Sequence, residues 1–158
     1  MSIHHTAIIT GDVQIDTGVV VEPYAVITGS ARIHRDAYIG AHAVIGAFAQ
    51  SHGTYPAPIT GERRAQGVIV GAGACVREFA TVHQGLLRPT VIGGNALVMA
   101  YCHVSHDSVV GNDVTMSTTA TLGGFTTIGA GATLGQHAVT HPWVCLLYTS
   151  PSPRDQRG

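Results

Sequence analysis

The segment from Met99 to Asp107 holds the residues in this chain that are best suited to chemistry. It reads Met-Ala-Tyr-Cys-His-Val-Ser-His-Asp, so His103 and His106 stand three residues apart and Asp107 follows directly. Imidazole groups exchange protons near neutral pH and also bind metal ions. The cluster is therefore a candidate for proton transfer or for metal binding, and the surrounding elements decide which side chains can act together.

The cluster lies inside a repeat of six residues. An aliphatic residue recurs every six positions, and a compact residue follows each one four positions later. The aliphatic series around the cluster is Ile92, Val98, Val104, Val110, Met116, Leu122, Ile128 and Leu134. Its compact partners are Ala96, Cys102, Ser108, Val114, Ala120, Thr126, Ala132 and Ala138. This pattern predicts a hexapeptide parallel β-helix, in which each unit is one short strand and a corner.

The same register runs from Ile3 to Ala49 and resumes at Val70. Two segments interrupt it, residues 50–67 and 83–91, and the first is too rich in Pro and Gly to continue the strands. The expected fold is therefore all-β, a parallel β-helix of hexapeptide repeats with loop excursions. Such loops usually build binding surfaces, because the walls of the coils are flat.

Side-chain alternation predicts which residues of the cluster face outward. If Val104 points inward, His103 points outward and Asp107 lies in the outer turn, so the imidazoles are expected to be exposed on a rigid wall. Counting faces places His83 and His141 on the same side, about one and two coil spacings of roughly 4.8 Å away. Asp107 also occupies a position where Gly, Asn or Asp serves the turn, and this purely structural interpretation stays open.

Composition excludes several classes of protein. The net charge is −1 and the chain has no lysine, which argues against a nucleic-acid partner. No apolar run is long enough to span a membrane, and no export signal opens the chain. Cys75, Cys102 and Cys145 lack disulfide or zinc spacing, which favours a cytoplasmic location. No cofactor and no resident metal are expected.

The last residues have a different character. After Val144 the period is expected to end, and residues 145–155 can be back-translated into a transposon-based sequencing adapter. The expected organisation is therefore one β-helix domain over residues 1–144, a fragment of a longer protein, followed by a non-native tail over residues 145–158. The nucleotide sequence across the stretch tests this interpretation.

The motifs resemble those of the bacterial UDP-N-acetylglucosamine acyltransferases of lipid A synthesis, a hexapeptide-repeat family. Three segments carry the resemblance: residues 76–83, residues 97–107 and residues 120–124. The resemblance implies a left-handed β-helix and a homotrimer whose sites lie between neighbouring subunits. It also implies an O-acyltransferase that moves a (3-hydroxy)acyl chain from acyl carrier protein to the 3-hydroxyl of UDP-N-acetylglucosamine.

The resemblance also implies roles for single residues. His106 matches the family's general base, Asp107 would hold the imidazolium that forms, and the Gly124 N–H would stabilise the oxyanion. His83, His103 and His141 match positions that contact or position the sugar nucleotide. The chain has no lysine for the family's Asp-x-Lys element, and phosphate binding then falls to Arg63 or Arg64. Phe125 stands where the family commonly has a further histidine, and Pro142 where a glutamine is usual.

Three alternatives stay open. The chain could acylate another amino-sugar nucleotide. It could also be an inactive truncated β-helix, because the family's last coils and C-terminal helical part are missing from it. A hexapeptide-repeat carbonic anhydrase would bind zinc through three histidines from two subunits, although its ligand spacing differs from His103/His106 and from His137/His141. Metal analysis separates this last alternative from the acyltransferase.

Overall fold

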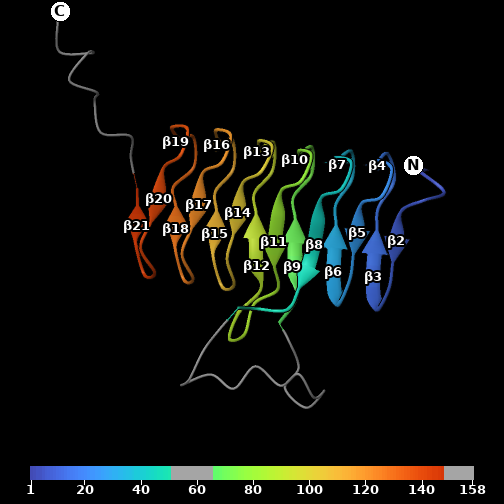
Figure 1. The fold of residues 1–158 in the computed structure, drawn as a ribbon, viewed down its shortest axis with the longest axis horizontal. Helices are drawn as coiled ribbons and strands as arrows, with labels where there is room; N and C mark the ends of the chain where they lie inside the picture. Colours follow the sequence, from blue (N-terminus) through green and yellow to red (C-terminus); the bar gives the residue numbers. More distant parts are fainter. Residues whose placement is uncertain (51–65, 148–158) are drawn as a thin grey trace, which may run out of the picture.

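The computed structural model describes residues 1–50 and 66–147, and within them every regular element is a short β-strand. The strands form three parallel sheets of seven strands each, and successive strands enter the three sheets in turn. The chain thus winds as a solenoid of about seven coils that matches a left-handed β-helix, which confirms the expected fold class. Figure 1 shows the coils stacked along the long axis, with the first and last described coils at opposite ends.

Each sheet contains one strand from every coil. The first sheet consists of β1 (Ser2–Ile3), β4 (Val20–Val21), β7 (Tyr38–Ile39), β10 (Cys75–Val76), β13 (Leu97–Val98), β16 (Thr115–Met116) and β19 (Thr133–Leu134). The second sheet consists of β2 (Ile8–Ile9), β5 (Val26–Ile27), β8 (Val44–Ala47), β11 (Thr81–His83), β14 (His103–Val104), β17 (Thr121–Leu122) and β20 (Val139–Thr140). The third sheet consists of β3 (Asp12–Ile15), β6 (Ser30–Ile33), β9 (Val68–Val70), β12 (Thr90–Ile92), β15 (Val109–Val110), β18 (Thr127–Ile128) and β21 (Cys145–Leu146).

The six-residue pattern decides which side chains form the core. Ile27, Val104 and Leu122 are fully buried, because every inward aliphatic packs against those of the coils above and below it. The first coil differs: Ile3 and Ile9 stay 39% and 36% exposed, since β1 and β2 pair with a strand on one side only. Burying one such aliphatic side chain stabilises a fold by roughly 1.5–3 kcal/mol, so the interior coils carry most of the stability.

At most corners of the described coils, the residue three positions after the inward aliphatic has a left-handed backbone. Asp36, Asn95 and Asp107 adopt φ values of 59°, 54° and 60°, as the turn chemistry predicts. Aromatic and histidine side chains also occupy this position, and Phe79 and Phe125 have φ values of 59° and 60°. A left-handed conformation costs a residue with a Cβ roughly 1–2 kcal/mol. Stacking of these rings from coil to coil offsets part of that cost, at about 0.5–1.5 kcal/mol per pair.

The repeat extends beyond the boundary expected from the sequence. Strand β21 pairs with β18, and Leu146 lies opposite Ile128, so the six-residue register continues past Val144. The expectation that the period ends at Val144 is therefore wrong by one strand. That residues 145–158 are foreign to the protein stays a prediction. No helix in the described part of the chain is long and apolar enough to cross a membrane.

Candidate active site

The second sheet brings three of the predicted histidines to one wall. His83 ends β11 and His103 begins β14, and these strands are neighbours in the sheet. The two imidazoles meet edge to face with centroids 4.7 Å apart. His141 directly follows β20, two strands further along the same sheet. The prediction that these histidines share one face of the prism is confirmed.

The expectation that the imidazoles are exposed is wrong for two of them. His83 is 5% exposed, His106 is 8% exposed and Asp107 is completely buried. The loop between β11 and β12 covers the corner after β14, and its backbone N–H groups at residues 86–88 bond to the Asp107 side chain. His103 is half-buried and His141 is exposed. The alternation of side chains along a strand did not predict that His106 and Asp107 are buried, because the residues that cover them belong to the loop between β11 and β12.

Asp107 is the centre of a hydrogen-bond network. Its carboxylate accepts the three backbone N–H groups of residues 86–88 at 3.0, 2.7 and 2.9 Å and lies 2.8 Å from His106 Nδ1. Burial raises the pKa of Asp107, but these backbone N–H groups and His106 outweigh it and hold the pKa below its ordinary value. The group is therefore a carboxylate at neutral pH, and it does more than serve the turn.

The network around Asp107 continues to its main chain. Its backbone N–H donates to Thr90 Oγ1 at 2.9 Å, and the Arg88 Nε–H donates to its carbonyl oxygen at 2.8 Å. Thr90 is fully buried. Together the loop and the first residue of β12 fix the carboxylate and the main chain of Asp107, and so they fix the partner of His106.

This network decides which ring nitrogen of His106 carries the proton when the ring is neutral. An ionised carboxylate only accepts hydrogen bonds, so neutral His106 carries its proton on Nδ1 and donates it to Asp107. Nε2 is then left with a free lone pair. A Cβ built on Gly124 would lie 2.8 Å from His106 Cε1 and 2.9 Å from Nε2. The basic edge of the ring therefore faces the backbone of Gly124, where only glycine fits.

The Gly124 N–H is available to a ligand. It has no acceptor among the described residues. The N–H at the same place in another six-residue repeat, at Ala100 after a strand of the first sheet, has no acceptor among the described residues either, so the free donor alone is not distinctive. Gly124 differs because His106 Nε2, the atom that can accept a proton, lies close to its backbone. A group held between the two would meet a base on one side and a hydrogen-bond donor on the other.

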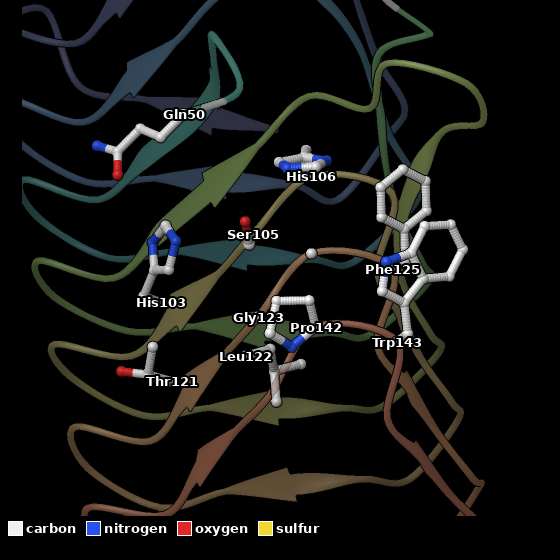
Figure 2. Close-up of a pocket in the computed structure, with 11 residues that line it drawn as sticks. Gln50, His103, Ser105, His106, Thr121, Leu122, Gly123, Phe125, Pro142 and Trp143 are labelled. Carbon is white, nitrogen blue, oxygen red and sulfur yellow. The ribbon is translucent and has the colours of Figure 1, made fainter. Parts of the chain in front are cut away.

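A groove of about 450 Å³ opens beside this pair. Its lining residues are Gln50, His103, Ser105, His106, Thr121, Leu122, Gly123, Gly124, Phe125, Pro142 and Trp143. Figure 2 shows Gln50, His103, Ser105 and Thr121 on one side of the groove and the rings of Phe125 and Trp143 on the other. Phe125 meets His106 edge to face at 5.3 Å and stacks on Trp143 at 3.9 Å. The groove therefore has a polar half and an aromatic half.

The two histidines beside the base are neutral at neutral pH. Burial, with His103 and His106 nearby, lowers the pKa of His83 to about 4. Burial and the neighbouring His106 also lower the pKa of His103, whose Nδ1 lies 2.7 Å from Thr81 Oγ1. His83 Nδ1 is buried and has no hydrogen-bond partner among the described residues. Such imidazoles suit the hydroxyl and amide groups of a polar ligand and do not act as cations.

The structure unites five of the predicted site residues, His83, His103, His106, Asp107 and Gly124. His83 and His141 lie on the same wall, but neither is among the residues that line the groove. Arg63 and Arg64 lie outside the described residues. Within the described part of the chain, no three His, Cys, Asp or Glu side chains are grouped so that they could hold a metal ion.

Sequence reasoning missed two kinds of residue. Trp143 stands three residues after Thr140, as Phe125 stands three after Leu122, and these strands are paired, so the same counting could have predicted the stack. The donors in residues 86–88 act through the main chain, and no residue type signals them. Thr90 gave no signal either, because a threonine in a β-strand is common.

Comparison with known proteins agrees with the repeat and the fold. The family described as bacterial transferase hexapeptide (six repeats) matches residues 12–47. An acyl-(acyl-carrier-protein)–UDP-N-acetylglucosamine O-acyltransferase from Trichlorobacter lovleyi is 45% identical over 131 residues, which cover 74% of this chain and 50% of the relative. The enzyme of the same name from Thermodesulfovibrio yellowstonii is 31% identical over 136 residues, covering 77% and 53%.

Solved structures give the same result. The UDP-N-acetylglucosamine acyltransferase from Campylobacter jejuni superposes with a TM-score of 0.79 at 28% identity, covering 91% of this chain and 62% of that one. The corresponding enzyme from Moraxella catarrhalis RH4 shares the fold, with a TM-score of 0.73 at 24% identity and 92% and 62% coverage. The chain spans about half the length of the Trichlorobacter lovleyi and Thermodesulfovibrio yellowstonii relatives.

Proposed function

Because this chain is a hexapeptide-repeat protein similar in sequence and fold to UDP-N-acetylglucosamine O-acyltransferases, we propose that its full-length protein is an acyltransferase of this kind. The reaction would move an acyl chain from acyl carrier protein to the 3-hydroxyl of UDP-N-acetylglucosamine, the first step of lipid A synthesis. We also propose that the reaction takes place in the cytoplasm. A homotrimer would place the groove between neighbouring subunits, and light scattering of the purified protein tests that assembly.

One observation supports this function above the others: a buried carboxylate fixes the tautomer of His106, and the free Nε2 faces the backbone of Gly124. An alcohol is a poor nucleophile at neutral pH, so a base must take its proton as it attacks. General-base assistance is typically worth about 10²–10⁴ in rate. The arrangement of acceptor and donor around one point is what the attack of a hydroxyl on a thioester needs.

The steps follow from these positions. His106 Nε2 takes the proton of the sugar hydroxyl while the hydroxyl oxygen bonds to the thioester carbon. The carbonyl oxygen becomes negative and accepts the Gly124 N–H, and Asp107 stabilises the imidazolium. The intermediate then collapses, the carbon–sulfur bond breaks, and the departing thiolate takes the proton back from His106. The products are the O-acyl sugar nucleotide and the free thiol of the carrier protein.

The polar half of the groove suits the sugar. Neutral His103, which lines the groove, can exchange hydrogen bonds with its hydroxyl and amide groups without the desolvation cost of a buried charge. Neutral His83 packs edge to face against His103, and we assign it to positioning that ring. We assign His141 to the outer part of the sugar nucleotide, since it lies on the same wall but outside the groove. Arg63 and Arg64 are proposed as phosphate ligands because the chain has no lysine.

The test is an assay of the full-length gene product with acyl carrier protein thioesters and two acceptors. One acceptor is UDP-N-acetylglucosamine and the other is the analogue with an amine in place of the 3-hydroxyl. Mass spectrometry of an ester product supports the proposal. An amide product alone would identify the amino-sugar alternative, and no acyl product with either acceptor would contradict acyl transfer to these sugars.

A further inference from the structure

The peptide bond between Gly123 and Gly124 presents the proposed oxyanion donor, and its carbonyl end is held from inside the solenoid. The Ser108 hydroxyl donates to the Gly123 carbonyl oxygen at 3.1 Å, and Ser108 is completely buried. The peptide is trans, so its C=O and N–H groups point in opposite directions. Because the carbonyl points at a buried side chain, the Gly124 N–H points outward, to the side where the groove opens.

The carbonyl of Gly123 lacks the partner that this place in the repeat often has. At many corners the carbonyl accepts the backbone N–H three residues later, as Met99 accepts from Cys102 at 3.3 Å. Among the described residues, no backbone N–H donates to the Gly123 carbonyl. The Ser108 hydroxyl takes the place of that bond, so a single side chain decides how this peptide is held.

Other compact residues of the repeat make the same bond where they carry a donor. Cys102 Sγ donates to the Ser117 carbonyl oxygen at 3.1 Å. Thr126 Oγ1 donates to the His141 carbonyl oxygen at 3.3 Å. Each donor precedes its carbonyl by 15 residues, and the same is true of Ser108. The bond is therefore a property of the fold, and its effect depends on the peptide that it reaches.

The three peptides differ in what their N–H groups can serve. The peptide that Thr126 reaches ends in Pro142, which has no N–H. The peptide that Cys102 reaches ends in Thr118, which follows β16 in the first sheet, whereas the base follows β14 in the second sheet. Of the three, the peptide bonded to Ser108 is the one that presents an N–H beside the base.

The other side of Gly123 is held by hydroxyl groups as well. Its nitrogen lies 3.1 Å from the Thr140 carbonyl oxygen and 3.2 Å from Thr140 Oγ1. Thr126 Oγ1 lies 3.1 Å from that hydroxyl, and because it donates its own proton to the His141 carbonyl, it accepts the proton of Thr140. The main chain before Gly124 is thus fixed in advance, so its N–H needs no reorganisation to receive an oxyanion.

We propose that Ser108 is a positioning residue of the acyl transfer, whose buried hydroxyl orients and polarises the peptide that presents the Gly124 N–H to the oxyanion. The inference rests on the proposed function and adds a residue to its mechanism. A hydrogen bond to a peptide carbonyl draws electron density toward the oxygen. The N–H of the same peptide then becomes a stronger donor, by about 10–30% for one such bond. Ser108 touches no substrate and acts through Gly124.

Replacement of Ser108 by alanine removes the hydroxyl with little change in packing, because Ala96 and Ala120 fill the same place in other repeats and are completely buried. Loss of a whole oxyanion donor costs about 10²–10³ in kcat, so weakening it by about 10–30% costs about 2-fold to 8-fold. Looser orientation of the peptide adds to this loss. We expect kcat of the full-length Ser108→Ala protein to fall by about 3-fold to 10-fold, with KM for both substrates unchanged.

Two further variants complete the set. Ser108→Cys keeps a weaker donor, and the position accepts it, since Cys102 makes the same bond from the equivalent place. Its kcat should lie between those of the wild type and Ser108→Ala. Cys102→Ala is the matched control, because it removes the same kind of bond from a peptide outside the site, and it should leave kcat unchanged. Circular dichroism and urea titration show whether each variant keeps the β-helix.

Infrared spectroscopy separates this role from a purely structural one. An isotope-labelled thioester carbonyl is bound to the full-length His106→Ala protein, in which transfer is slow enough for the donor to persist. A hydrogen bond from the Gly124 N–H lowers the frequency of the carbonyl stretch. Adding Ser108→Ala to this protein should move the band to higher frequency, and adding Cys102→Ala should leave it in place.

The outcomes separate the inference from the proposed function. A slower Ser108→Ala protein with the pH profile of the wild type supports the inference, because His106 and Asp107 keep their bond. An unchanged kcat, an equal loss in Cys102→Ala or an unshifted carbonyl band overturns it. If Ser108→Ala does not fold, Ser108→Cys decides: a lower kcat at unchanged stability supports the inference, and the wild-type kcat overturns it. A wild-type protein that transfers no acyl chain would overturn the proposed function itself.

Discussion

Replacement of Gly124 by alanine tests the contact between base and backbone. The added Cβ would lie 2.8 Å from His106 Cε1 and 2.9 Å from Nε2, closer than such atoms approach in proteins. The φ of Gly124 is not in the left-handed region, so alanine itself adopts this backbone without strain. His106 cannot yield freely, because Asp107 holds Nδ1 at 2.8 Å and is itself held by three backbone N–H groups.

The expected loss follows from these distances. Ordinary contact begins near 3.4 Å, so the ring must move by about half an ångström or more, or Gly124 must move away from it. Displacement of a reacting group by about 1 Å can cost 10²-fold in rate. The Cβ also occupies space that the thioester would use. We expect kcat to fall by about 10²–10⁴, close to the whole contribution of a general base.

The assay is steady-state acyl transfer by the full-length protein, with KM measured for both substrates. Gly94→Ala is the matched control: Gly94 stands at the same place in the repeat, and a Cβ there would meet its nearest neighbour at 3.4 Å, an ordinary contact. Circular dichroism should show the same β-helix for both variants. A Gly124→Ala enzyme that kept more than about a third of the wild-type kcat would refute the steric argument.

Three further predictions concern stability and the supporting loop. Ile27→Ala should lower the free energy of unfolding by about 2–5 kcal/mol and Ile3→Ala by clearly less, because Ile27 is fully buried and Ile3 is 39% exposed; urea titration measures both, and equal losses would contradict the core assignment. In the unfolded chain His83 binds a proton below about pH 6.5, but in the folded protein only below about pH 4. The free energy of unfolding should therefore fall by up to about 3 kcal/mol as the pH is lowered from about 6.5 to about 4. His83→Gln should flatten that dependence in denaturant titrations, and an unchanged slope would show that His83 is not the cause. Thr90→Val leaves the buried Asp107 N–H unpaired and should cost about 1–3 kcal/mol, whereas Thr90→Ser restores the acceptor; equal stabilities of the two variants would contradict that bond.

The fold was predictable because one physical rule repeats along the chain. Each unit needs an aliphatic residue inside and a residue that tolerates a tight corner, and both requirements are visible at fixed spacing from Ile3 onward. The same counting placed His83 and His103 on one wall, because strands of consecutive coils pair in register. The gathering of the histidines therefore followed from the period.

The details of the site depend on contacts that the period does not encode. The burial of His106 and the charge of Asp107 come from a loop that leaves the repeat and donates main-chain N–H groups to that carboxylate. Every residue type except proline carries the same backbone N–H, so no residue type signals these donors. The repeat ends later than the predicted boundary at Val144 for another reason. Leu146 keeps the six-residue register and pairs with Ile128, but the residues that follow it do not continue the pattern.

The proposed function depends on His106, held by Asp107, acting as the base of an acyl transfer. The most direct measurement is the single-turnover rate of the full-length His106→Ala protein, saturated with acyl carrier protein thioester and UDP-N-acetylglucosamine. The expected rate is about 10²–10⁴ below that of the wild type, with the β-helix intact by circular dichroism. A folded His106→Ala protein that transfers the acyl chain at the wild-type rate would contradict the claim.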